Sequence, residues 1–244
     1  MINNQKVALI IPARMQSTRL PGKVLKKINN KTILERVFNK CSKVFNKKNI
    51  FIATPDLEII NFCKSKNYFF IKTSSSCLTG TDRLYEVAKK LNYNYYINVQ
   101  ADEIFLNSQN IINVYSELIK KKYDVINCYK EIKSKAEYYS NSVPKVVFNQ
   151  KNELLYMSRA AIPSNKKQIF KKSYKQICVY GFTKSSLLTF GSQRKKTKLE
   201  NYEDIEILRF IELGTNVKMI QGSGSRLSID TISDYKLAKK IIKN

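Results

Sequence analysis

The chain has 244 residues, of which 44 are lysine or arginine, 19 are aspartate or glutamate and none is histidine, and its formal net charge is +25 at pH 7. This length suits one compact α/β domain with a sizeable core. The lack of histidine excludes Ser-His-Asp and Cys-His nucleophilic catalysis and most zinc chemistry, so any catalysis depends on carboxylates, cations, another bound metal or positioning.

Cysteines and apolar runs bear on the cellular compartment. The five cysteines lie far apart and form no C-x-x-C pair, so they predict neither a disulfide framework nor a zinc site. No apolar run approaches the roughly 20 residues of a membrane-spanning helix, and the N-terminus MINNQK lacks a signal-peptide pattern. We therefore expect a cytoplasmic protein that does not associate with a membrane.

The positive charge does not identify a partner by itself. Nucleic acid would suit it, but only eight of the 44 cations are arginines, and no basic stripe with interleaved aromatic residues marks a base-stacking groove. We expect no nucleic-acid partner. A non-catalytic basic binding module nevertheless stays an alternative.

The first half of the chain alternates short apolar runs with helical patterns. The predicted strands are residues 7–11, 50–53, 69–72 and 95–100, and the predicted helices are residues 32–45, 55–65 and 82–91. Thr54 is the expected N-cap of the second helix, with Pro55 as its first residue. This alternation predicts βαβ units and a parallel sheet with helices on both faces.

The pattern changes after about residue 125. Strand-like runs occupy residues 125–129, 144–148, 153–157 and 177–182, and N-Q-K-N at 149–152 is typical of a hairpin turn. We therefore expect an antiparallel extension over about residues 125–200. A helix over 202–213, a strand over 217–221 and a helix over 233–243 complete one domain, residues 1–244.

The first predicted strand leads into a loop rich in cations. Arg14, Arg19 and Lys23 fall within ten residues, together with Ser17, Thr18 and a proline-glycine bend. Cations this close repel one another unless an anion lies among them, so the loop predicts a phosphate-bearing ligand. It matches neither G-x-x-x-x-G-K-[ST] nor G-x-G-x-x-G, so side chains and a few amides would hold the phosphate.

Two carboxylates follow apolar segments. Asp102 comes directly after the predicted strand 95–100, and Asp230 ends the segment R-L-S-I-D. Two carboxylates that meet at strand ends among phosphates form a natural Mg²⁺ site. Asp230 alone would equally suit the N-cap of the last helix, and spacing does not separate these interpretations.

Eight collinear motifs resemble the 3-deoxy-manno-octulosonate cytidylyltransferase (CMP-Kdo synthetase) family of CMP-sugar synthetases. They are IIPARMQSTRLPGKVL, TGTDRL, INVQADE, KVVF, LYMSRAAIP, VYGF, LENYEDIEILR and IDT, and they span nearly the whole chain. The resemblance implies a Rossmann-like nucleotidyltransferase fold with an antiparallel element that helps to form a homodimer. It also implies Mg²⁺-dependent transfer of CMP from CTP to the anomeric hydroxyl of a sugar acid, Kdo first among them, for lipopolysaccharide biosynthesis.

The resemblance implies roles for individual residues. The residues expected to bind the nucleotide are Arg14, Ser17, Thr18, Arg19, Lys23, Gly80, Thr81 and Gln100. The residues expected to hold Mg²⁺ are Asp102 and Asp230, and these two together with Arg14 and Lys23 are the expected catalytic residues. The residues expected to bind the sugar acid are Arg159, Tyr180 and Glu206.

The chain also departs from the family pattern. Ala101 and Ile104 alter the usual G-D-E-P, while Gln176 and Ile207 replace a usual histidine and glutamine on the acceptor side. Another acceptor, such as an amino-substituted Kdo or a nonulosonate, therefore stays an alternative. The segment RMQSTRLPGKVL also resembles the spore-coat polysaccharide cytidylyltransferase-like group, which is a further alternative.

Overall fold

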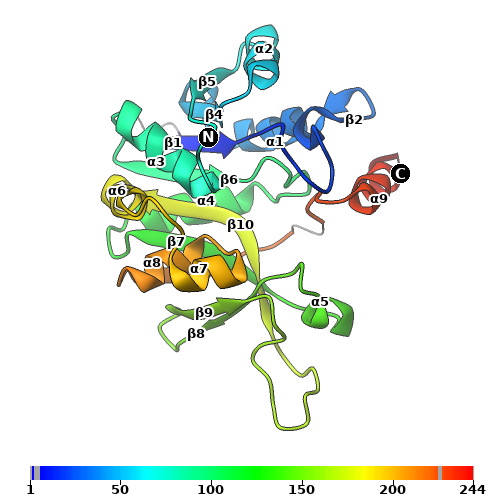
Figure 1. Ribbon diagram of the computed structural model, residues 1–244, viewed down its shortest axis with the longest axis vertical. Helices are drawn as coiled ribbons and strands as arrows, with labels where there is room; N and C mark the ends of the chain where they lie inside the picture. The colour runs from blue at the N-terminus through cyan, green and yellow to red at the C-terminus, as the bar shows by residue number, and fades with distance from the viewer. Residues whose placement is uncertain (1, 3–5, 225–226, 244) are drawn as a thin grey trace.

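The computed structural model describes residue 2, residues 6–224 and residues 227–243. At its centre lies a sheet whose described strands follow the order β11-β7-β10-β6-β1-β4-β5 (Figure 1). Neighbouring strands are parallel except where β10 pairs with β6 and β7, so the expected α/β class with a mostly parallel sheet is confirmed. The strands are β1 (Val7–Pro12), β4 (Ile50–Thr54), β5 (Phe69–Lys72), β6 (Tyr95–Val99), β7 (Val125–Glu131), β10 (Tyr174–Thr183) and β11 (Val217–Gln221).

The burial of strand β1 explains the unbroken apolar run at residues 7–11. All six of its residues are buried. Val7 and Leu9 enter the core on one face of the sheet and Ala8 and Ile10 enter the core on the other, because side chains alternate along a strand. A strand covered on both faces favours apolar side chains along its whole length.

Two groups of helices cover the two faces. The helices that share a core with Val7 are α1 (Ile33–Ser42), α2 (Leu57–Ser65), α4 (Gln109–Leu118) and α9 (Ile232–Lys243), and those that share a core with Ala8 are α3 (Gly80–Lys90), α6 (Lys184–Ser192) and α8 (Ile207–Glu212). The shorter elements are β2 (Lys27–Ile28), β3 (Lys31–Thr32), α5 (Lys135–Tyr139), α7 (Lys198–Glu203) and the 3-10 helices Lys23–Leu25 and Lys47–Asn49. No helix in the described part of the chain is long and apolar enough to cross a membrane.

The strands expected as an antiparallel extension divide into two groups. Strands β8 (Lys145–Phe148) and β9 (Leu154–Ser158) form a hairpin beside the start of β10, below the central sheet in Figure 1. Strands β7 and β10 instead belong to the central sheet, where β10 lies between β6 and β7. Antiparallel pairs over this range therefore lie both on the main path of the sheet and on the branch that β8 and β9 form beside β10. The strand pattern was visible in the sequence, but the partner of each strand was not.

Two predicted helix boundaries are wrong. Thr54 is not an N-cap but the last residue of β4, where it pairs with Lys72 of β5, and the helix starts at Leu57 after Asp56. The helix predicted over 202–213 is divided into α7 and α8, because Asp204 between them adopts a left-handed conformation with φ 52°. In both places, contacts with the rest of the fold outweigh the local sequence preference.

The arrangement of the strands decides where a ligand can bind. The carboxyl ends of β1, β5 and β6 meet at one edge of the sheet, because these strands run in the same direction. Loops 13–22, 73–79 and 100–108 leave from this edge. Open α/β sheets bind ligands at such an edge, where the connecting loops converge.

Candidate active site

A cavity of about 290 Å³ opens at the carboxyl edge of the sheet. Its wall combines the loop after β1, the turn before α3, the turn after β6, the α6–α8 region and the segment before α9. Ten of the thirteen expected site residues line it: Arg14, Ser17, Thr18, Arg19, Lys23, Gly80, Gln100, Asp102, Glu206 and Asp230. Segments far apart in the sequence thus meet around one polar cavity.

The cationic loop is fixed by backbone hydrogen bonds at both ends. The Ala13 amide donates to the carbonyl of Ala53 at 2.9 Å, and the Gly22 amide donates to the carbonyl of Met15 at 3.0 Å. Gly22 has φ 65°, a left-handed conformation that glycine adopts without the steric cost of a side chain. The bend therefore holds Lys23, which follows it, at the floor of the cavity.

Lys23 joins the two aspartates. Its Nζ lies 2.5 Å from Oδ2 of Asp102 and 3.0 Å from Oδ1 of Asp230, and Nη2 of Arg19 lies 3.4 Å from the same Asp230 oxygen. Burial disfavours the ammonium, but the charges and hydrogen bonds of the two carboxylates outweigh it and raise the pKa of Lys23. Two carboxylates from distant parts of the chain therefore meet at one ammonium group.

The structure also shows that Asp230 is not the N-cap of the last helix. Thr231 takes that position, because its Oγ1 accepts from the amide of Asp234 at 3.2 Å. Its own amide donates back to Asp234 at 2.8 Å, which completes a capping box. The Asp230 carboxylate is thus left to Lys23 and Arg19.

The two aspartates fit a Mg²⁺ ion better than a soft metal. The described residues contain no group of three or more His, Cys, Asp or Glu side chains that could hold a metal alone. Mg²⁺ commonly uses one or two carboxylates and takes its remaining ligands from waters and substrate phosphates. The donor set of Asp102 and Asp230 therefore suits Mg²⁺ bound together with a nucleotide.

The N-terminus of α3 forms another wall and is occupied by Glu206. One Glu206 oxygen accepts from the Gly80 amide at 3.0 Å, and the other accepts from the Thr81 amide at 2.8 Å. Burial raises the pKa of Glu206, although these hydrogen bonds act in the opposite direction. A side chain at position 80 would approach Nε2 of Gln100 to 3.2 Å, so glycine allows Gln100 and Glu206 to come together here.

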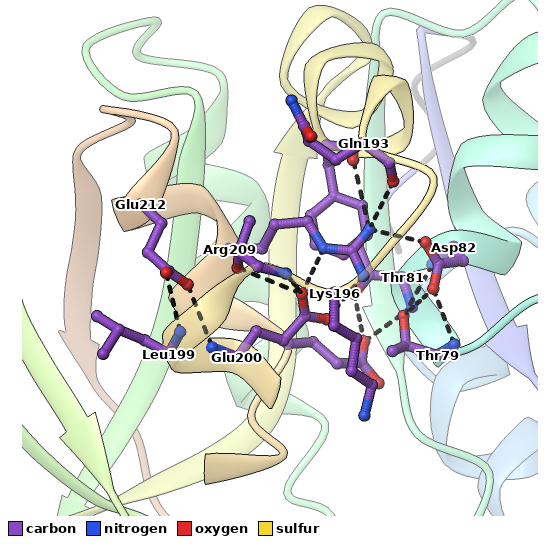
Figure 2. Close-up of polar contacts among 12 residues, drawn as sticks. Thr79, Thr81, Asp82, Gln193, Lys196, Leu199, Glu200, Arg209 and Glu212 are labelled. Carbon is purple, nitrogen blue, oxygen red and sulfur yellow. Dashed lines mark hydrogen bonds and ion pairs between the residues drawn. The ribbon is translucent and has the colours of Figure 1, made fainter. Parts of the chain in front are cut away.

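A buried ion cluster supports this wall (Figure 2). Arg209 donates to both carboxylate oxygens of Glu200, at 2.6 and 2.7 Å, and to Oδ1 of Asp82 at 2.9 Å. The other Asp82 oxygen accepts from the amide and hydroxyl of Thr79, the N-cap of α3. Arg209 also lies 3.7 Å from the centre of the Phe190 ring. The cluster ties α7 and α8 to the first turn of α3, directly behind the cavity.

Comparison with known proteins places the chain in a family. Residues 8–220 match the family model described as Cytidylyltransferase. The chain belongs to the cytidylyltransferase family. It is 34% identical to 3-deoxy-manno-octulosonate cytidylyltransferase of Rickettsia felis over 247 residues, which cover 100% of this chain and 98% of the relative. The enzyme of the same name from Rickettsia prowazekii is 35% identical over 246 residues, 99% of this chain and 97% of the relative.

Solved structures agree with this assignment. The structure of CMP:2-keto-3-deoxy-manno-octonic acid synthetase complexed with CTP matches with a TM-score of 0.89 and 27% identity, covering 98% of this chain and 99% of that one. The 4-diphosphocytidyl-2C-methyl-D-erythritol synthase of Anaerococcus prevotii matches with a TM-score of 0.66 and 15% identity, over 98% and 96% of the two chains. The second match shows a shared fold only.

Three expected residues of this cytidylyltransferase do not line the cavity. Thr81 is buried and its hydroxyl donates to Glu206. Tyr180 is buried in the sheet, where its hydroxyl contacts the Gln176 amide and burial raises its pKa. Arg159 lies outside the wall, and its guanidinium donates to backbone carbonyls. Of the residues expected to bind the sugar acid, only Glu206 lines the cavity.

The sequence interpretation missed two cations that line the cavity. Arg83 is buried, and its Nη1 donates to Oγ1 of Thr73 and to the carbonyl of Ser74, both at 2.9 Å. Lys196 lies in the loop before α7, with its Nζ 2.5 Å from Oδ1 of Asp204. Arg83 ends the motif T-G-T-D-R and could have been found there, whereas Lys196 stands among several lysines and carried no distinguishing signal.

Proposed function

We propose that this chain is a cytoplasmic enzyme that transfers CMP from CTP to the anomeric hydroxyl of 3-deoxy-manno-octulosonate (Kdo), for lipopolysaccharide biosynthesis. The observation that carries the proposal is the contact of Lys23 with both Asp102 and Asp230 at the floor of a cavity lined by the cationic loop. The Rickettsia relatives carry the name of this activity, and the similar synthetase structure contains CTP. In the reaction the sugar hydroxyl oxygen bonds to the α-phosphorus, the bond from that phosphorus to pyrophosphate breaks, and the hydroxyl proton passes to solvent.

Electrostatics and positioning suffice for such a reaction. Arg14, Arg19 and Lys23 extend from the loop after β1 and would neutralise the charge of the triphosphate and of the departing pyrophosphate. In phosphoryl-type transfer most of the rate acceleration comes from these two effects. No nucleophilic side chain and no covalent intermediate are required.

Asp102 and Asp230 are the residues that would hold Mg²⁺. When bound, the ion would lower the pKa of the attacking hydroxyl and neutralise phosphate charge. The two carboxylates already attract one cation, the Lys23 ammonium. Lys23 would then be free to turn toward the phosphates, which carry the opposite charge.

The expected homodimer is also a proposal. Among the described strands, β9 pairs along its length with β8 alone, and Leu155 in β9 is 56% exposed. A strand edge that lacks a partner strand and carries an exposed apolar side chain favours pairing with another chain. Light scattering coupled to size-exclusion chromatography would measure the mass directly, and a mass of one chain would contradict this proposal.

The central experiment measures pyrophosphate release by the purified chain with Mg²⁺, CTP and Kdo. We expect release to require both substrates and to fall about 100-fold or more in Asp102→Asn, the typical effect of losing one group that stabilises developing charge. Asp124→Asn is the matched control, because Asp124 is exposed and lies just before β7, at the opposite edge of the sheet. Failure of the wild-type chain to release pyrophosphate with CTP and Kdo would refute the proposed function. A panel of other nucleotides and sugar acids identifies the alternatives.

A further inference from the structure

A part of the cavity wall outside the cationic loop also carries a cation. Lys196 lines the cavity together with Glu200, Asp204 and Glu206. It lies between α7 and the turn that holds Thr79 and Thr81 (Figure 2). Its side chain is 23% exposed, so it is sheltered by the wall but open to a ligand.

The partner of Lys196 is an anion that a ligand could replace. Lys196 Nζ lies 2.5 Å from Oδ1 of Asp204, whose side chain is 72% exposed. The hydrogen bond from Lys196 and nearby positive charges lower the pKa of Asp204, so the carboxylate is charged at neutral pH. Ion pairs with such an exposed partner contribute little to stability because water screens them. A carboxylate on a substrate could therefore take the place of Asp204 at small cost.

Arg159, the cation expected to bind the sugar carboxylate, is engaged elsewhere. Its Nε donates to the carbonyl of Glu203 at 2.6 Å, its Nη2 to the carbonyl of Asp204 at 3.0 Å and its Nη1 to the carbonyl of Asn141 at 3.2 Å. Its Nη2 also lies 4.0 Å from Oδ2 of Asp204, so that carboxylate keeps a cationic neighbour when it leaves Lys196. It does not line the cavity. Arg159 thus holds the corner between α7 and α8 in place, which is the corner that presents Asp204.

The other cations that line the cavity are assigned to the triphosphate or donate hydrogen bonds within the protein. Arg14, Arg19 and Lys23 come from the loop proposed to bind the triphosphate. Arg83 donates to Thr73 and to the carbonyl of Ser74. Among the cavity-lining residues that the structure describes, this leaves Lys196 as the cation available for a second anionic substrate.

We propose that Lys196 binds the carboxylate of the sugar acid and that this carboxylate displaces Asp204 from Lys196. The inference rests on the proposed function and adds a residue that determines the acceptor. Lys196 selects acceptors that carry a carboxylate, and Asp204 occupies the position when no acceptor is bound.

Steady-state kinetics of Lys196→Gln tests this assignment. We expect KM for Kdo to rise about 10-fold or more, the typical effect of losing a hydrogen bond to a charged group, while KM for CTP stays unchanged. Lys196→Arg keeps the charge and should recover part of the loss. Lys195→Gln is the matched control, because Lys195 is the exposed neighbour in the same loop and does not line the cavity.

Asp204→Asn provides a second and opposite test. Asparagine tolerates the left-handed conformation of position 204, so the backbone should be kept. Removal of the competing charge should lower KM for Kdo by about 2-fold to 5-fold. A structural role of the Lys196–Asp204 pair would instead raise KM in both variants.

The outcomes separate this inference from the proposed function. If the wild-type chain turns over CTP and Kdo but Lys196→Gln keeps the wild-type KM for Kdo, the role of Lys196 is refuted and the proposed function stands. Equal increases in KM for CTP and for Kdo would also refute it. If the wild-type chain releases no pyrophosphate with CTP and any sugar acid, the proposed function fails and the inference fails with it. The amide of Kdo, which lacks the negative charge, should abolish the difference between wild type and Lys196→Gln.

Discussion

Replacing Arg209 by methionine would leave the Glu200 carboxylate buried without its cation. Both residues are buried, and the guanidinium also pairs with Asp82. Removal of one partner from a buried ion pair typically costs about 3–5 kcal/mol, since the remaining charge is neither hydrated nor neutralised. In a domain of this size about 1 kcal/mol shifts Tm by about 2–4 °C. We therefore expect the Tm of Arg209→Met to fall by about 6–20 °C.

Differential scanning calorimetry measures this shift, with two comparison variants. The double variant Arg209→Met and Glu200→Gln removes the stranded charge and should recover part of the lost Tm. Lys198→Met is the control for loss of a cation on α7, because Lys198 is exposed, and it should leave Tm almost unchanged. A Tm of Arg209→Met within about 2 °C of wild type would show that the cluster contributes little to stability.

Three further predictions concern other parts of the fold. In Gly191→Ala the new Cβ would lie 2.1 Å from the Tyr85 ring. We therefore expect the free energy of unfolding, measured by urea titration, to fall by about 1–3 kcal/mol. An unchanged value would contradict the packing of α3 against α6. Thr231→Ala removes the N-cap of α9 and should lower the free energy of unfolding by about 1 kcal/mol, whereas Thr231→Ser should stay close to wild type. Equal losses in the two variants would contradict the capping role. Burial lowers the pKa of Lys145 from 10.5 to about 8, so the unfolded state binds more protons between these values and stability from this group rises with pH. The free energy of unfolding of wild type relative to Lys145→Met, from urea titrations, should therefore increase by about 2 kcal/mol between pH 7.5 and pH 10, and a constant difference would contradict the lowered pKa.

The sequence predicted the parallel sheet because the signals for it are local. The apolar run of β1 and the helical spacing of Leu34, Val37 and Cys41 follow from how each element is buried. The meeting of Asp102 and Asp230 was expected from the family resemblance, because spacing alone suited Asp230 equally well to the N-cap of the last helix. Helix α4 also has apolar residues at helical spacing, Ile111, Val114 and Leu118, yet it was not predicted.

What the sequence could not show depends on contacts between distant residues. The place of β10 between β6 and β7 depends on pairings such as Tyr180 with Asn98, for which alternating hydrophobicity supplies no partner. The position of Arg159 is decided by carbonyls of the α7–α8 corner, more than 40 residues away, and not by its own motif. Lys196 became notable only when the structure placed it beside the cavity.

The contact between Lys23 and Asp230 spans 207 positions of the chain. During synthesis on the ribosome, strands β1, β4, β5 and β6 can assemble early, but the free side of β6 has no partner until β10 has emerged. The cavity wall is complete only after Asp230 and the following helix α9 have been synthesised. Chains that end early therefore carry the basic loop without the second carboxylate, and we expect such fragments to lack catalysis even where most of the sheet has folded.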